Sequence, residues 1–143
     1  MSLALVPQHG YVLGTLVGGV LVQNVWMAIQ VGMARRKYKV CYPTMYAKED
    51  TPDAKTFNCV QRAHQNTLEM ISTFNTLLIV AGARYPIAAS VAGLVYIVGR
   101  IVFFKGYSTG KADNRRRGAF NAFGLLALIG MVGRWGIELA TSR

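Results

Sequence analysis

The stretch YVLGTLVGGVLVQNVWMAIQVGM, residues 11–33, contains no charged side chain. A helix needs about 20 predominantly apolar residues to cross the hydrocarbon core of a bilayer, so this stretch is long enough on its own. Its polar residues Gln23, Asn24 and Gln30 are expected to face protein or water, because lipid offers them no hydrogen-bond partner. The sequence therefore predicts a transmembrane helix here.

Three further uncharged blocks follow along the chain, and the charged residues fall between the blocks. Apolar residues make up 52% of the 143 residues, which is more apolar surface than a small soluble domain can bury. We predict an all-α fold, an integral membrane four-helix bundle that forms a single domain over residues 1–143. The spans are expected at about residues 11–33, 57–83, 87–104 and 118–139.

The formal net charge of +10 arises mainly in two connections between the predicted spans. Residues 34–56 and 105–117 hold eleven of the sixteen Lys and Arg residues. A nucleic-acid-binding protein would instead lay its cations along one surface, so we exclude nucleic acid as a partner. The positive-inside rule places both connections in the cytosol and both termini on the other side of the membrane.

The second span must contain charged residues, because its uncharged part is too short to cross a bilayer. Its helix is expected to begin near Phe57 and to include Arg62, Asn66 and Glu69. Positions i, i+4 and i+7 lie on one face of a helix, so these three side chains form a polar stripe. The third span carries Arg100 in the same way, and this residue either pairs with Glu69 or supports the stripe.

Ionisable residues inside a membrane are costly, and two interpretations explain the stripe. In the structural one, an Arg–Glu pair inside the bundle fixes the register of the helices. In the functional one, the stripe binds a polar ligand near the membrane surface. Arg62 would take a carboxylate through two parallel hydrogen bonds, Glu69 an ammonium group and Asn66 a peptide group. A short peptide such as glutathione carries all three groups.

The stretch FNCVQRAHQNTLE, residues 57–69, resembles the signature of the MAPEG family, the membrane-associated proteins of eicosanoid and glutathione metabolism. The core of that signature is Arg-Ala-x-x-Asn-x-x-Glu. Among the branches of the family, the type 3 microsomal glutathione S-transferases are the most similar. Three other parts of the chain resemble the family as well: residues 30–40, residues 93–100 followed by Gly106-Tyr107, and Gly118.

This resemblance implies a homotrimer with glutathione in a cleft between neighbouring subunits, open to the cytosol. An apolar electrophile or a lipid hydroperoxide would enter from the membrane lipid, and the protein would act as a glutathione transferase or peroxidase without a metal. The implied location is the endoplasmic reticulum membrane, with the outer mitochondrial membrane as the alternative. The residues that would hold glutathione are Arg35, Arg62, Asn66, Glu69 and Tyr107, and His64 would line the same cleft or pack between helices.

In the transferases of the family, an Arg at the start of the fourth helix stabilises the glutathione thiolate, since a neighbouring guanidinium lowers the pKa of a thiol. The candidates here are Arg115, Arg116 and Arg117. Counting back from Gly118 favours Arg115, with Arg117 second. Arg36 is expected to be a further cation near the thiol. The alternative interpretation of the basic run is an anchor to anionic lipid headgroups.

Met70 and Phe103 stand where the leukotriene-forming members of the family have tyrosines, so leukotriene synthesis is not the expected main activity. Two rival functions stay open. One is the branch of the family that binds and presents lipid without a catalytic Arg, although the basic run argues against it. The other is a small four-span multidrug exporter, which usually carries a Glu in its first span. The first span is uncharged here.

Overall fold

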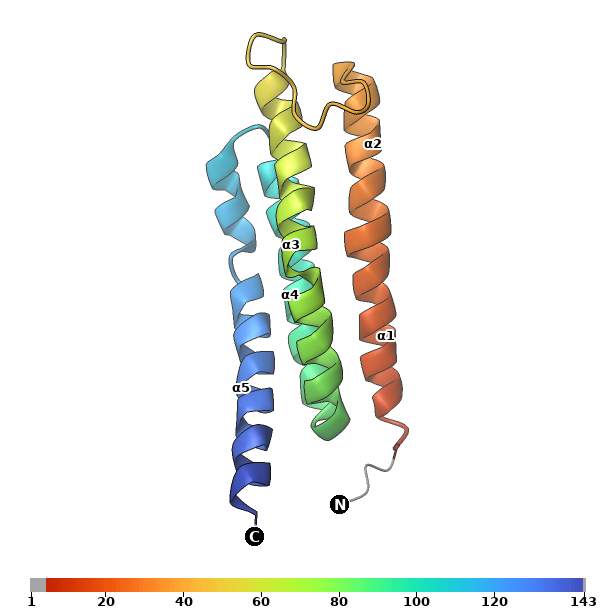
Figure 1. The fold of residues 1–143 in the computed structure, drawn as a ribbon, viewed down its shortest axis with the longest axis vertical. Helices are drawn as coiled ribbons and strands as arrows, with labels where there is room; N and C mark the ends of the chain where they lie inside the picture. The colour runs from red at the N-terminus through yellow and green to blue at the C-terminus, as the bar shows by residue number, and fades with distance from the viewer. Residues whose placement is uncertain (1–4, 143) are drawn as a thin grey trace.

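The chain forms four long helical rods that stand side by side, in a computed structural model that describes residues 5–142 (Figure 1). The first rod is helical without a break from residue 9 to residue 38, although six of its residues adopt π-helical geometry. The start of α1 and the end of α5 lie at one end of the bundle, and the connection 39–53 lies at the other (Figure 1). The elements are α1 (His9–Val20), the π-helix η1 (Leu21–Trp26), α2 (Met27–Tyr38), α3 (Ala54–Arg84), α4 (Pro86–Tyr107), the 3₁₀ helix η2 (Ala112–Gly118) and α5 (Asn121–Thr141).

Three of the rods are long and apolar enough to cross a membrane, judged by length and composition. They are His9–Tyr38, Pro86–Tyr107 and Asn121–Thr141. The fourth rod, α3, has 31 residues but does not meet the same test, because Arg62, Glu69 and other polar residues interrupt its apolar sequence. Residues 5–142 contain helices and no strand, so the predicted all-α fold is confirmed. The exact limits of the membrane spans stay predictions.

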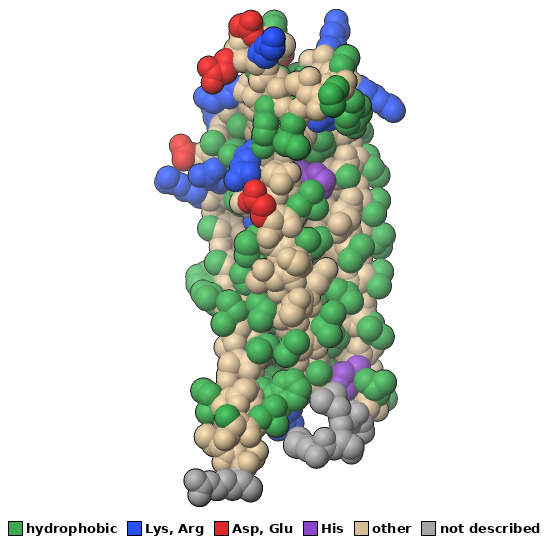
Figure 2. All heavy atoms as spheres, in the orientation of Figure 1, with side chains coloured by type: hydrophobic (Ala, Val, Ile, Leu, Met, Phe, Trp, Pro, Cys, Tyr) green, Lys and Arg blue, Asp and Glu red, His purple; other side chains and the backbone are tan. Residues whose placement is uncertain are grey.

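Exposed apolar side chains lie along α1, α4 and α5, and apolar side chains run along the face seen in Figure 2. On α5, for example, Phe123 and Ile137 are 71% and 67% exposed. A soluble monomer does not leave such extensive apolar faces in water, so these faces contact lipid or another protein chain. Most of the charged side chains visible in Figure 2 lie in the half of the molecule that carries the connection 39–53.

The core consists of two apolar clusters, one above the other along the bundle. The cluster near the connection 39–53 is built around Met27 and Phe57, both fully buried. The second cluster is built around Phe74 and Tyr96, whose rings stack with their centroids 4.2 Å apart. The same stacked pair links α3 to α4 inside the bundle.

The connection 39–53 is fixed to the helices on both sides of it. Asn58 at the start of α3 accepts a hydrogen bond from the backbone N–H of Ala47 at 2.7 Å and donates one to its carbonyl at 2.9 Å. Arg35 near the end of α2 donates to the carbonyl of Thr44 at 2.7 Å. The polar connection is therefore an ordered cover over the charged end of the bundle.

α4, η2 and α5 approach one another through glycines. A Cβ atom at Gly118 would collide with backbone atoms of Phe103 and Gly99 on α4, and a Cβ atom at Gly106 would collide with the backbone of Asn114. Glycine allows this close approach because it has no side chain. The contacts hold η2, which carries the predicted basic run, against the end of α4.

We expect Gly118→Ala to destabilise the fold by about 1–3 kcal/mol, because its Cβ would push η2 away from α4. Gly130→Ala in α5 is the matched control, since nothing lies within 4 Å of a Cβ atom at that position. Thermal unfolding of the two purified variants, followed by circular dichroism, measures the difference. Equal unfolding temperatures for both variants and the wild type would contradict the close approach described here.

Candidate functional site

The polar stripe of α3 lies on an open face of the bundle. Arg62 Nη1 donates to Glu69 Oε1 at 2.9 Å, and the two side chains are 45% and 43% exposed. Both partners belong to the same helix, so this pair cannot fix the register between helices. Its exposure instead leaves both charged groups within reach of a ligand from outside the chain.

Asn66 lies between these two residues on the same face and is held from behind by α4. Arg100 is 4% exposed, and its Nη2 atom donates to Asn66 Oδ1 at 3.1 Å and to Thr67 Oγ1 at 2.6 Å. The guanidinium also lies 4.3 Å from the centre of the Phe103 ring. Arg100 therefore contacts Asn66 and not Glu69.

A cavity of about 590 Å³, here called the α3 cavity, opens beside Arg62. This volume is in the range of small-molecule sites. Arg62 and Tyr107 are the predicted site residues in its wall, and Asn66 and Glu69 continue the same face of α3 one and two turns further on. The cavity is lined by Tyr46, Glu49, Ala54, Lys55, Asn58, Cys59, Arg62 and Tyr107.

Arg115 reaches this cavity through Tyr107. Its Nη1 atom donates to the Tyr107 hydroxyl at 3.1 Å, and its guanidinium lies 5.1 Å from the centre of the Tyr107 ring. A 3₁₀ helix has about three residues per turn, so consecutive side chains point in three different directions. All three side chains are exposed; Arg116 turns to Asp113, at 3.4 Å, and among the described residues Arg117 makes no side-chain hydrogen bond or ion pair. Of the three candidates, Arg115 is the one in contact with a residue of the cavity wall.

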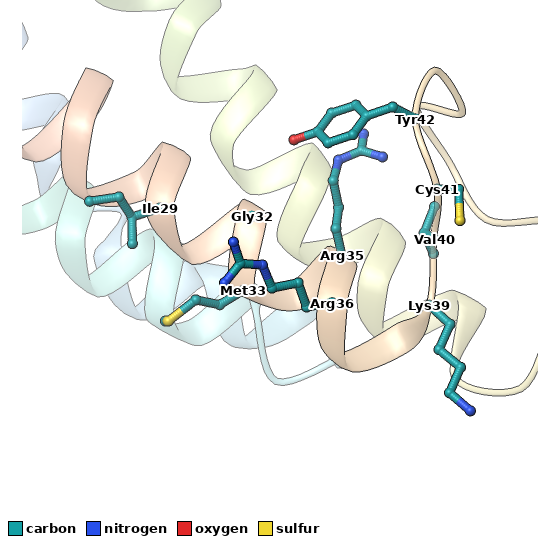
Figure 3. A pocket seen from close by; sticks show the side chains of 9 residues that line it. All are labelled: Ile29, Gly32, Met33, Arg35, Arg36, Lys39, Val40, Cys41 and Tyr42. Carbon is teal, nitrogen blue, oxygen red and sulfur yellow. The ribbon is translucent and has the colours of Figure 1, made fainter.

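A second cavity, of about 630 Å³, lies where α2 meets the connection 39–53 and is called the α2 cavity (Figure 3). Figure 3 shows the Arg35 guanidinium beside the Tyr42 ring, 4.3 Å from its centre. Arg36 points along α2 past Met33 in the same view. The cavity combines cations with apolar residues, and its lining is Ile29, Gly32, Met33, Arg35, Arg36, Lys39, Val40, Cys41 and Tyr42.

The α2 and α3 cavities share no lining residue. The fully buried Phe57 packs beside Arg35, with its ring centre 5.5 Å from the guanidinium. One chain therefore brings together Arg62, Asn66, Glu69, Tyr107 and Arg115, and it holds Arg35 and Arg36 in a separate cavity.

His64 lines neither cavity. His64 is two residues after Arg62 on the same helix, so the two side chains point in nearly opposite directions. The Nε2 atom of His64 lies 3.1 Å from the carbonyl oxygen of Gln23 in η1. This contact links α3 to the π-helical part of the first rod. Within one chain, His64 is placed to pack between α3 and η1.

Several residues of the α3 cavity were not predicted from the sequence. Lys55, Asn58 and Cys59 share one face of α3 with the predicted Arg62, so helical spacing could have indicated them. Tyr46 comes from the connection 39–53, where no periodic pattern exists to reveal it. The chemistry of the wall is rich in cations and hydrogen-bond donors, and within residues 5–142 no three His, Cys, Asp or Glu side chains are grouped to hold a metal ion.

Apolar outer faces, helices long enough to span a bilayer and a polar cavity at one end define a polytopic membrane protein. The MAPEG family model matches residues 13–137, and the chain therefore belongs to the MAPEG family.

Three relatives are similar over much of the chain. The chain is 39% identical over 116 residues to microsomal glutathione S-transferase 2 of Homo sapiens, covering 80% of this chain and 74% of that protein. The Bos taurus protein of the same name is 37% identical over 116 residues, covering 80% and 75%. Leukotriene C4 synthase of Bos taurus is 35% identical over 91 residues, covering 63% and 56%. The first two of these relatives carry the type 2 name, so the similarity to the type 3 branch stays a prediction.

Proposed function

We propose that this protein is a membrane-bound glutathione transferase that activates glutathione as a thiolate for attack on apolar electrophiles or lipid hydroperoxides. The observation that carries the proposal is the contact between Arg115 and Tyr107 at the α3 cavity, whose wall also contains Arg62. Its relatives include proteins named microsomal glutathione S-transferase and leukotriene C4 synthase, which supports a transferase that uses glutathione.

Glutathione would bind by replacing the ion pair between Arg62 and Glu69. In the free chain the two side chains neutralise each other at 2.9 Å. A zwitterionic peptide can replace this contact with two equivalent ones, its carboxylate on Arg62 and its ammonium group on Glu69. Asn66, between them on the helix, would bind a peptide group of the ligand.

The chemical role falls to Arg115. Its guanidinium would stabilise the negative sulfur of glutathione and so lower the pKa of that thiol, while the released proton passes to water. The thiolate then forms a carbon–sulfur bond with the electrophile as its leaving group departs or its epoxide ring opens. With a hydroperoxide, the thiolate attacks the outer oxygen and forms a sulfur–oxygen bond while the O–O bond breaks, and the departing alkoxide takes a proton from water to become an alcohol. A second glutathione then attacks the sulfur of the resulting sulfenic acid, which gives glutathione disulfide and water.

The separation of the two cavities favours a site shared between copies of the chain. Arg35 and Arg36 line the α2 cavity and cannot join the α3 cavity of the same chain in this structure. In the proposed homotrimer, the α2 cavity of one subunit would face the α3 cavity of its neighbour. His64 could reach glutathione only in this shared arrangement, because within its own chain it faces η1.

The apolar faces of the rods favour access for the second substrate from the lipid. We propose a multi-pass protein of the endoplasmic reticulum membrane with residues 34–56 and 105–117 in the cytosol, where glutathione is supplied. The relatives named microsomal support this location. The lipid-presenting rival lacks support because Arg115 is held at the cavity, and the exporter rival lacks support because the first rod contains no acidic residue.

We expect Arg115→Ala to lower kcat at neutral pH by about tenfold or more while the affinity for glutathione changes little. Without the guanidinium, the pKa of the bound thiol rises toward that of a free thiol, so the rate–pH curve should move to higher pH. Steady-state kinetics with an activated chloronitrobenzene measure this. Arg117→Ala is the matched control and should behave like the wild type; if Arg117→Ala lost activity and Arg115→Ala did not, the assignment would be wrong.

We expect Arg62→Ala and Arg35→Ala chains to be inactive separately and to regain activity when they are expressed together. In mixed trimers, some interfaces would combine an intact α3 cavity with an intact α2 cavity. The measurement is transferase activity of the co-purified chains, with gel filtration to confirm that each variant assembles. Assembled mixtures that stay inactive would show that the two cavities do not form one site.

A further inference from the structure

The Arg100 side chain is a buried cation that is compensated by neutral groups. It is 4% exposed, and its Nε atom is buried without a hydrogen-bond partner among the described residues. The ion pairs found within residues 5–142 do not include it. Burying a charge in this way is costly, so the position of this guanidinium calls for a role that a neutral side chain could not fill.

In each hydrogen bond around Arg100, the chemistry of the two groups decides which one donates and which one accepts. The carbonyl of Ala63 can only accept, so the Thr67 hydroxyl must donate to it, over 3.0 Å. The lone pairs of that hydroxyl are then free to accept from Arg100 Nη2 at 2.6 Å. The guanidinium can only donate, so the atom of the Asn66 amide that faces it, at 3.1 Å, must be the oxygen Oδ1.

The consequence is a fixed orientation of the Asn66 amide. With Oδ1 held by Arg100, the Nδ2 group is the end of the amide left for the open face of α3. Asn66 is half-buried, and within residues 5–142 its Nδ2 group donates to no other atom. Along the stripe, a cation at Arg62 is thus followed by a hydrogen-bond donor and then by an acceptor at Glu69.

We infer that Arg100 is a positioning residue that fixes Asn66 as a hydrogen-bond donor toward the ligand. The inference rests on the proposed function and makes it more specific: Asn66 binds an oxygen of glutathione, a peptide carbonyl or a carboxylate, and rejects an N–H group. A side chain of the same shape that can only accept would therefore fail at this position, even though it would suit Arg100 well.

Asn66→Asp tests this directly, because a carboxylate has the shape of the amide but offers no donor. It would pair with Arg100 at least as well as Asn66 does, so the unfolding temperature should be unchanged or raised. The affinity for glutathione should fall by about tenfold or more, because the carboxylate of the variant would face an oxygen of glutathione and neither group could donate a hydrogen bond. Calorimetric titration with glutathione and thermal unfolding of the same detergent-purified samples measure the two effects.

Thr67→Val is the matched control. It removes the other acceptor of Arg100 and leaves Asn66 in place, so it should lower the unfolding temperature while the folded protein binds glutathione with wild-type affinity. Arg100→Gln should raise KM for glutathione several-fold with a smaller effect on kcat, because the Asn66 amide would be free to turn.

The outcomes separate the inference from the proposed function. Weaker binding by Asn66→Asp at undiminished stability supports the inference. If the wild type binds glutathione and Asn66→Asp binds it equally well, the inference is overturned and the proposed function stands. If the wild type does not bind glutathione, the proposed function fails and the inference fails with it.

Discussion

The arrangement of the site depends on one contact inside the bundle, the hydrogen bonds from Arg100 on α4 to two side chains of α3. A guanidinium in a membrane-spanning helix must find oxygen acceptors within the protein, and Asn66 and Thr67 provide them at 3.1 and 2.6 Å. This contact fixes α4 against α3 at the level of the polar stripe. It also fixes which face of α4 turns toward the α3 cavity.

Further along α4, that face carries the link between the interior and the cavity. The Arg100 guanidinium lies against Phe103, whose ring meets Tyr107 edge-on with centroids 5.8 Å apart. Tyr107 in turn accepts a hydrogen bond from Arg115. The glycine contacts that hold η2 against α4 complete this path, because they place the Arg115 backbone beside the end of the helix. The contacts that pack α4 in the bundle therefore also position Tyr107 and Arg115 at the α3 cavity.

The sequence predicted the features that follow from periodicity. Uncharged blocks indicated helices, and the i, i+4, i+7 spacing indicated that Arg62, Asn66 and Glu69 share a face. Counting back from Gly118 ranked Arg115 ahead of Arg117, but the sequence could not show which of the three arginines contacts Tyr107, because that depends on the direction of each side chain in a 3₁₀ helix. The sequence also could not show that His64 contacts the π-helix, since nothing in the pattern of residues 21–26 indicates π-helical geometry.

In the proposed mechanism, the α3 cavity binds glutathione and holds its sulfur as a thiolate. The most direct measurement is the ultraviolet difference absorbance of the detergent-purified wild-type protein at the thiolate band when glutathione is added at neutral pH. We predict a saturable thiolate signal, because the Arg115 guanidinium would favour the charged sulfur. Binding of glutathione with no thiolate signal, or no binding at all, would contradict the account.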